Sequence, residues 1–185
     1  GYLNVDAGTM NPYKHGEVFV TEDGAETDLD IGHYERFLDR DMNQMSIFTS
    51  GKLMQELMSK ERQGDYLGND VQIIPHFTNL IKEKIHNAYE SSKADISIIE
   101  VGGTVGDMEN EAIVEAVRQL RQDLGYHNVV YVHLGYIPYL MASKELKTKP
   151  IQNSVKDLRM RGIIPDFLVC RADYPIPEAI IEKIA

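Results

Sequence analysis

The feature that most constrains the fold is an apolar run followed by a glycine-rich turn and an acidic helix start. Residues 96–101 are mostly β-branched, which is typical of a strand buried in a parallel sheet. Glu100 lies near the C-terminal end of this expected strand, where α/β sheets bind ligands. Glycines within 102–106 allow close backbone approach, and Asp107 and Glu109 lead into a helix. This order indicates a nucleotide–metal site, although a tight turn before a solvated, acid-capped helix fits the same residues.

Similar alternation of apolar strands and amphipathic helices extends along the chain. Further strands are expected at 17–21, 71–74, 129–134 and 167–170. Helices are expected from Thr49 or Ser50 to near Gly64, through Phe77, Ile81 and Ile85, from about Ile113 to Gly125, from Pro150 to Gly162, and around Lys183. The pattern predicts an α/β fold with a parallel sheet in three layers, and residues 1–185 show no repeat or linker that would divide one domain.

Composition limits the classes of partner. The hydrophobic fraction of 43% is ordinary for a globular protein, and the net charge is −10. An acidic chain without basic runs argues against nucleic-acid or anionic-membrane partners. No apolar run approaches ~18 residues, so we expect no transmembrane helix. Cys170 is the single cysteine, which is consistent with a reducing cytoplasm and with a buried hydrophobic role.

Two further groups of charged residues are candidates for binding. Five carboxylates lie between positions 22 and 30, and most are expected to form a solvated loop. Asp30, set between apolar neighbours, is the exception that we expect to face a cation. Lys147 and Lys149 precede or begin a helix, where the helix dipole disfavours cations unless an anion shares the site. We therefore interpret them as phosphate ligands, with solvated surface lysines as the alternative.

Several long motifs resemble one family. They are His15–Val20 running into Glu22–Asp30, Gly64–Gly68, Glu100–Glu109, and Lys147–Pro150 with Gln152 and Ser154. Together they resemble the synthetase (amidoligase) domain of the CTP synthase family, over essentially the whole chain. The resemblance implies a P-loop NTPase-like (Rossmann-like) fold, with the phosphate-loop segment expected before Gly1 and absent from this chain. It also implies a glutaminase domain beyond Ala185, so that residues 1–185 form a partial synthetase domain.

The resemblance implies a ligase of pyrimidine nucleotide biosynthesis. The family aminates UTP to CTP: ATP phosphorylates the uracil 4-oxygen, and ammonia released from glutamine displaces the phosphate. Expected cofactors and ligands are ATP, Mg²⁺, UTP and the feedback inhibitor CTP. The expected form is a cytoplasmic homotetramer, with no nucleic-acid or membrane partner.

The resemblance also implies roles for single residues. Asp30 and Glu100 are expected to hold Mg²⁺ and, with Lys147, to be catalytic. Asp107, Met108 and Glu109 are expected to bind CTP, and His15 to lie near the route of ammonia. The expected ligands of UTP and CTP are Lys147, Thr148, Lys149, Pro150, Ile151, Gln152 and Lys183.

Departures from the family pattern leave alternatives. The chain has Ala7 for a usual proline, Lys144 for glycine, Ile151 for threonine and Asn153 for histidine. Without the phosphate loop, we expect this chain alone to be inactive. The alternative function is a non-catalytic module of the same family that senses CTP and oligomerises. A related ATPase of the dethiobiotin-synthetase type would share the fold but lack Lys147–Pro150.

Overall fold

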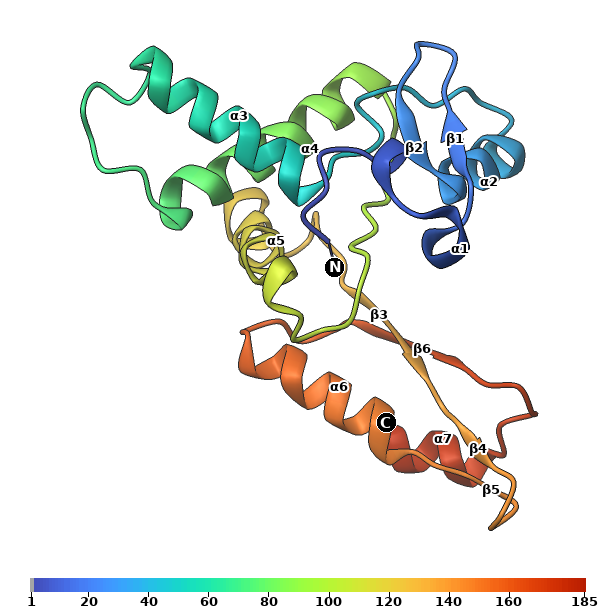
Figure 1. Cartoon of the computed structure of the whole chain (residues 1–185). Helices are drawn as coiled ribbons and strands as arrows, with labels where there is room; N and C mark the ends of the chain where they lie inside the picture. Colours follow the sequence, from blue (N-terminus) through green and yellow to red (C-terminus); the bar gives the residue numbers. More distant parts are fainter. Residues whose placement is uncertain (1) are drawn as a thin grey trace. The chain divides into compact units, whose positions relative to one another are not determined.

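The computed structural model describes residues 2–185, except for the side chain of His15. It divides into two compact units: Gly1–Gly103 with Asp107–Ala116, and Thr104–Gly106 with Val117–Ala185. The boundary falls within a glycine turn and within one helix, and not at a linker. Figure 1 traces the elements along the chain.

The first unit opens with a short antiparallel hairpin that leads into a helix. After two helical turns, η1 (Ala7–Thr9) and α1 (Pro12–His15), strand β1 (Val18–Val20) pairs with β2 (Glu26–Asp28). Thr27 is fully buried in β2, and its hydroxyl donates to the Phe19 carbonyl at 2.9 Å. Helix α2 (Leu29–Leu38) follows directly, so Asp30 lies in its first turn.

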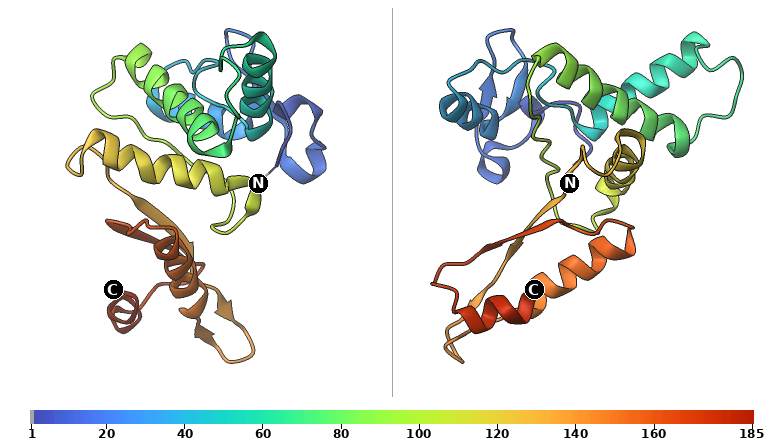
Figure 2. Two further views of the ribbon diagram at one scale, coloured as in Figure 1. Left: turned by 90° about the vertical axis from the view of Figure 1, so that its left-hand side faces the viewer. Right: turned by 180° about the vertical axis from the view of Figure 1, so that it is seen from behind.

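Two longer helices supply the core of the first unit. Helix α3 (Ser50–Gln63) begins at Thr49, whose hydroxyl accepts from the Lys52 amide, and ends at Gly64 in the left-handed conformation. Helix α4 (Thr78–Ser92) packs beside it (Figure 2). The apolar stripes predicted from four-residue spacing form this core; its most buried members are Leu53, Leu57, Phe77, Leu80 and Ile81. The two helices are therefore where the sequence predicts them.

Two predicted strands of the first unit are wrong. Residues 71–74 lead into an irregular helical turn, η2 (Ile73–Phe77), and Ile73 and Ile74 are half exposed. Residues 96–101 form no strand either, and Ile98 is 91% exposed. A strand requires a neighbour that accepts and donates its backbone hydrogen bonds, and the described residues pair no strand with either run. Composition alone does not supply that neighbour.

The acidic helix start is present. After the extended run, Met108–Asn110 forms a short 3₁₀ turn (η3), and helix α5 (Glu111–Leu124) continues from it. Gly125 has a φ of 90° and its amide donates to the Arg121 carbonyl, which ends α5 as predicted.

The second unit contains the parallel strand pair of the described chain. Strand β3 (Val132–Tyr136) pairs in parallel with β6 (Phe167–Arg171), and helix α6 (Lys149–Met160) lies along one face of β3 (Figure 2). Alternate residues of β3 point to this helix, and His133 and Gly135 are buried there. The opposite residues are exposed: Val132, Leu134, Tyr136, Phe167 and Val169.

Two small elements complete the second unit near the C-terminal end of β3. A hairpin of β4 (Tyr139–Leu140) and β5 (Glu145–Leu146) precedes α6, and helix α7 (Glu178–Ile184) ends the chain. The predicted α/β class and one parallel pair are therefore confirmed. The described residues form three two-stranded sheets, so a continuous sheet in three layers stays a prediction. Within the described part of the chain, no helix is both long and apolar enough to cross a bilayer.

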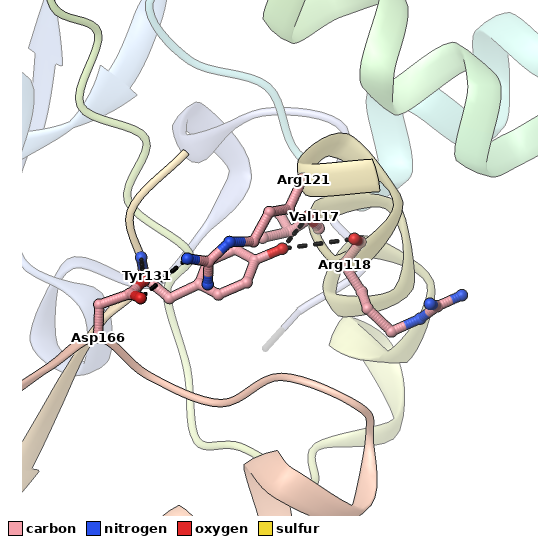
Figure 3. Close-up of polar contacts among 5 residues, drawn as sticks. All are labelled: Val117, Arg118, Arg121, Tyr131 and Asp166. Atoms are coloured by element: carbon pink, nitrogen blue, oxygen red, sulfur yellow. Dashed lines mark hydrogen bonds and ion pairs between the residues drawn. The ribbon is translucent and has the colours of Figure 1, made fainter. Parts of the chain in front are cut away.

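An arginine braces the end of α5 against the strands of the second unit (Figure 3). The guanidinium of Arg121 bonds to the Asp166 carboxylate at 2.8 Å and lies over the rings of Tyr126 and Tyr131. Asp166 also accepts the Tyr131 amide at 2.8 Å, while the Tyr131 hydroxyl donates to the Val117 carbonyl at 2.9 Å. These contacts hold the residues that immediately precede β3 and β6 in place.

Candidate functional site

The hairpin and α2 bring acidic side chains toward the extended segment that carries Glu100. Asp28 ends β2, and its carboxylate accepts a hydrogen bond from the Tyr2 hydroxyl at 3.0 Å. Burial raises the pKa of Glu100, and the negative charges of Asp30 and then Asp28 raise it further. Part of the Glu100 side chain reaches solvent, but neighbouring atoms desolvate its carboxyl group. Asp30 and Glu100 therefore lie within electrostatic range of each other.

The same negative charges also raise the pKa values of two tyrosines. Burial and the hydrogen bond to Asp28 raise the pKa of Tyr2 to about 12. Burial also raises the pKa of Tyr34, with smaller effects from Glu100 and then Asp30. A negative field of this kind attracts a cation.

The donor set at this acidic group fits Mg²⁺ better than a metal held by protein alone. Mg²⁺ usually takes one or two carboxylates and fills its other positions with water and substrate phosphate oxygens. Asp30 and Glu100 offer two carboxylates whose repulsion a cation would relieve. No group of three or more metal-binding side chains occurs among residues 2–185 outside the His15 side chain. Two carboxylates are the number that Mg²⁺ usually takes from a protein when phosphate oxygens complete its shell.

The segment Asp107–Glu109 is anchored by the residues that flank it. Asn110 is buried, and its side-chain amide donates to the Gly102 carbonyl at 2.6 Å. The Glu109 carbonyl accepts from the Ser50 hydroxyl at 3.5 Å, which connects the turn to α3. Met108 is 87% exposed and the Glu109 side chain is exposed as well. The backbone is thus fixed while side chains remain accessible to a ligand.

The lysine segment of the second unit begins α6. The Lys147 amide donates to the Pro138 carbonyl at 2.9 Å, Thr148 is buried, and Pro150 occupies the first turn of the helix. Ile151 is 1% exposed and packs against Gly135 of β3. Burial of these two residues fixes the turn that presents the lysines.

Lys183 lies close to the same turn. The Gln152 side-chain amide donates to the Lys183 carbonyl at 3.2 Å, which joins the start of α6 to α7. The Lys147 ammonium bonds to Glu145 at 2.5 Å, and the charge of Lys183 also acts on Glu145. The structure therefore brings together Lys147, Gln152 and Lys183, which are 36 residues apart at most.

The predicted site residues fall into two groups, one in each unit. The acidic group and Asp107–Glu109 belong to the first unit, and Lys147–Gln152 with Lys183 belongs to the second. The side chain of His15 lies outside the described residues. The binding roles of both groups stay predictions.

Sequence reasoning missed several residues of these groups. Tyr2 and Asp28 contribute to the acidic group, Asn110 anchors the acidic turn, and Glu145 pairs with Lys147. Spacing could have indicated Glu145, because residues two apart in extended chain share a face. No local signal marks Asn110, whose partner is eight residues away across the glycine turn.

Comparison with known proteins agrees with the resemblance. A family model described as "CTP synthase N-terminus" matches residues 1–185. Over 184 residues, the chain is 56% identical to a protein named CTP synthase from Dehalococcoides mccartyi strain 195 and 57% identical to one from Staphylococcus aureus strain JH9; each match covers 100% of this chain and 34% of the relative.

A third relative named CTP synthase, from Rubrobacter xylanophilus, is 59% identical over 184 residues, covering 100% of this chain and 33% of that protein. The chain thus spans about a third of the length of the curated relatives it matches. With the family model matching its full length, the chain belongs to the CTP synthase N-terminus family.

Proposed function

We propose that this chain is the nucleotide-binding part of a ligase that aminates UTP to CTP with ATP and ammonia. The observation that carries the proposal is the meeting of Lys147, Gln152 and Lys183 at the start of α6. Lysine ammonium groups are strong donors to phosphate oxygens, and two lysines with a glutamine amide between them suit a triphosphate.

In the proposed reaction, the γ-phosphoryl group of ATP passes to the uracil 4-oxygen. Ammonia then attacks carbon 4, and phosphate leaves with that oxygen while a proton is released. Phosphoryl transfer depends mainly on positioning and charge neutralisation. Asp30 and Glu100 would hold Mg²⁺, which when bound supplies charge neutralisation at the ATP phosphates. Lys147, Lys149 and Lys183 hold the UTP triphosphate by charge-assisted hydrogen bonds.

Selection of the inhibitor CTP is assigned to Asp107, Met108 and Glu109. A carboxylate accepts hydrogen bonds at neutral pH and does not donate them. CTP carries an amino donor at position 4, whereas UTP carries a carbonyl acceptor there. The exposed Glu109 side chain can accept from that amino group, so it favours CTP over UTP. Ammonia from a glutaminase domain, a cytoplasmic location and a homotetramer belong to the same proposal.

The test measures CTP formation from UTP, ATP and ammonia by the full-length protein that carries this chain. Each charge-assisted hydrogen bond contributes ~1.5–3 kcal/mol, so Lys147→Ala should raise the KM for UTP roughly ten- to a hundredfold. The KM for ATP should change far less. Lys156→Ala, on the exposed face of α6, is the matched control and should leave both values unchanged.

Two results would contradict the proposal. An unchanged KM for UTP in Lys147→Ala would mean that Lys147 is a solvated surface lysine and not a phosphate ligand. Binding of CTP without any formation of CTP would support the non-catalytic sensing module instead.

A further inference from the structure

A carboxylate immediately precedes the lysine segment and has no role in the proposed reaction. Glu145 lies in β5, two residues before Lys147, and side chains two apart in extended chain point to the same side. The Lys147 Nζ donates to Glu145 Oε1 at 2.5 Å, with side chains 41% and 50% exposed. The end of Lys147 expected to contact phosphate is therefore already bound to an anion.

The backbone under this pair is held in place. In the hairpin, Leu140 of β4 pairs with Glu145, and Tyr139 pairs with Leu146. The Lys147 amide donates to the Pro138 carbonyl at 2.9 Å. The two side chains are thus presented from a fixed hairpin, and their meeting does not depend on a loop that moves freely.

The charge of Lys183, the second lysine of the site, also acts on Glu145. Hydrogen bonds from Lys147 and then Ser143 lower the pKa of Glu145, and the charge of Lys183 lowers it further. Glu145 is consequently ionised at neutral pH. Its carboxylate lies within reach of the charges of both lysines assigned to nucleotide phosphate.

A role in folding does not account for the pair. Ion pairs between exposed side chains contribute little to stability, because water screens them and both side chains lose rotamer freedom. A carboxylate does resemble a phosphate oxygen as an anionic acceptor of ammonium hydrogen bonds. The main effect of Glu145 is therefore on the binding of other anions, such as phosphate, to Lys147.

We propose that Glu145 competes with nucleotide phosphate for the ammonium group of Lys147. The inference rests on the proposed function of Lys147 and Lys183 as triphosphate ligands. Because of this competition, the affinity for UTP is lower than the lysines alone would provide. A triphosphate, with several charged oxygens, displaces Glu145 from Lys147. The ion pair between Glu145 and Lys147 forms again when the product leaves.

The test compares steady-state CTP formation at varied UTP in the full-length protein and its variants. Competition of the size of an exposed ion pair predicts that Glu145→Gln lowers the KM for UTP about two- to fivefold, with kcat unchanged. Glu145→Asp restores the charge and should return the KM toward its original value. Glu90→Gln removes an exposed carboxylate from α4 and should change nothing.

A double-mutant cycle shows whether Glu145 acts through Lys147. In the Lys147→Ala background, Glu145→Gln should have at most a residual effect on the KM. Thermal unfolding of Glu145→Gln should match that of the original protein, which separates this role from a structural one.

Three outcomes overturn the inference. If Lys147→Ala raises the KM while Glu145→Gln leaves it unchanged or raises it, Glu145 does not compete, although the proposed function stands. An equal effect of Glu145→Gln with and without Lys147 shows action by another route. If neither variant changes the KM for UTP, Lys147 is not a phosphate ligand, and the proposed function and the inference both fail.

Discussion

Substitution of Gly135 by alanine tests how the lysine segment is held. Gly135 lies on β3 under the first turn of α6, and a Cβ added there would come within 2.5 Å of Ile151 Cδ1 and closer still to Cγ1. Ile151 is 1% exposed, so its side chain cannot turn away from the new methyl group into solvent without losing its packing. The added methyl group must therefore push the first turn of α6 away from the strand.

The expected cost follows from the packing. Overpacking a full core costs about 1–3 kcal/mol, and we expect Gly135→Ala to lower the free energy of unfolding by that amount. Ile151→Ala alone leaves a cavity and should cost about 2–5 kcal/mol. In the double variant the new methyl group enters that cavity. The combined loss should therefore be smaller than the sum of the single losses by about 1–2 kcal/mol.

The assay is urea unfolding followed by far-UV circular dichroism, because the chain contains no tryptophan. The KM for UTP of Gly135→Ala should rise because Lys149 moves with the turn, while the KM for ATP should not. Leu134→Ala, at the neighbouring position that is 63% exposed, is the control and should change stability by less than about 0.5 kcal/mol. Strict additivity of Gly135→Ala and Ile151→Ala would refute the contact between them.

Three further predictions test the other parts of the account. Glu100→Gln should abolish CTP formation, and in metal-free buffer at neutral pH it should raise the melting temperature. The raised pKa of Glu100 means that the folded protein binds this proton more tightly than the unfolded chain, so ionisation of Glu100 lowers the stability as the pH rises. Below about pH 4 the carboxyl group is protonated in both states, and the difference in melting temperature between the variant and the original protein should vanish. Glu109→Lys should relieve inhibition by CTP and largely spare UTP turnover, with Glu90→Lys as the control; superimposable inhibition curves would leave Glu109 a solvated acid. Tyr131→Phe removes the hydrogen bond to Val117 and should cost about 0.5–1.5 kcal/mol in urea unfolding.

Local signals in the sequence predict the longer helices α3, α4, α5 and α6, but they miss α2, which begins directly after the acidic segment. Thr49 and Gly64 bound α3, and Gly125 ends α5, because capping depends on residues that are close in the chain. The strands at 71–74 and 96–101 were predicted from composition and are wrong. A strand depends on a partner that is distant in sequence, and an apolar run does not say which partner is available.

The candidate site divides in the same way. Lys147 and Lys149 could be predicted from the conflict between their charge and the helix dipole. The proximity of Lys183 to this turn could not, because it depends on the packing of α7 and on the bond from Gln152. Asp30 and Glu100 are 70 residues apart, so their electrostatic contact also required the structure.

The most direct test of the central claim is an experimental structure of the full-length protein with UTP, Mg²⁺ and a non-hydrolysable ATP analogue. The quantity to measure is the distance from the Lys147 and Lys183 ammonium nitrogens to the nearest UTP phosphate oxygen. We predict distances of about 2.7–2.9 Å, as in charge-assisted hydrogen bonds. A triphosphate bound elsewhere, with both ammonium groups in solvent, would contradict the account.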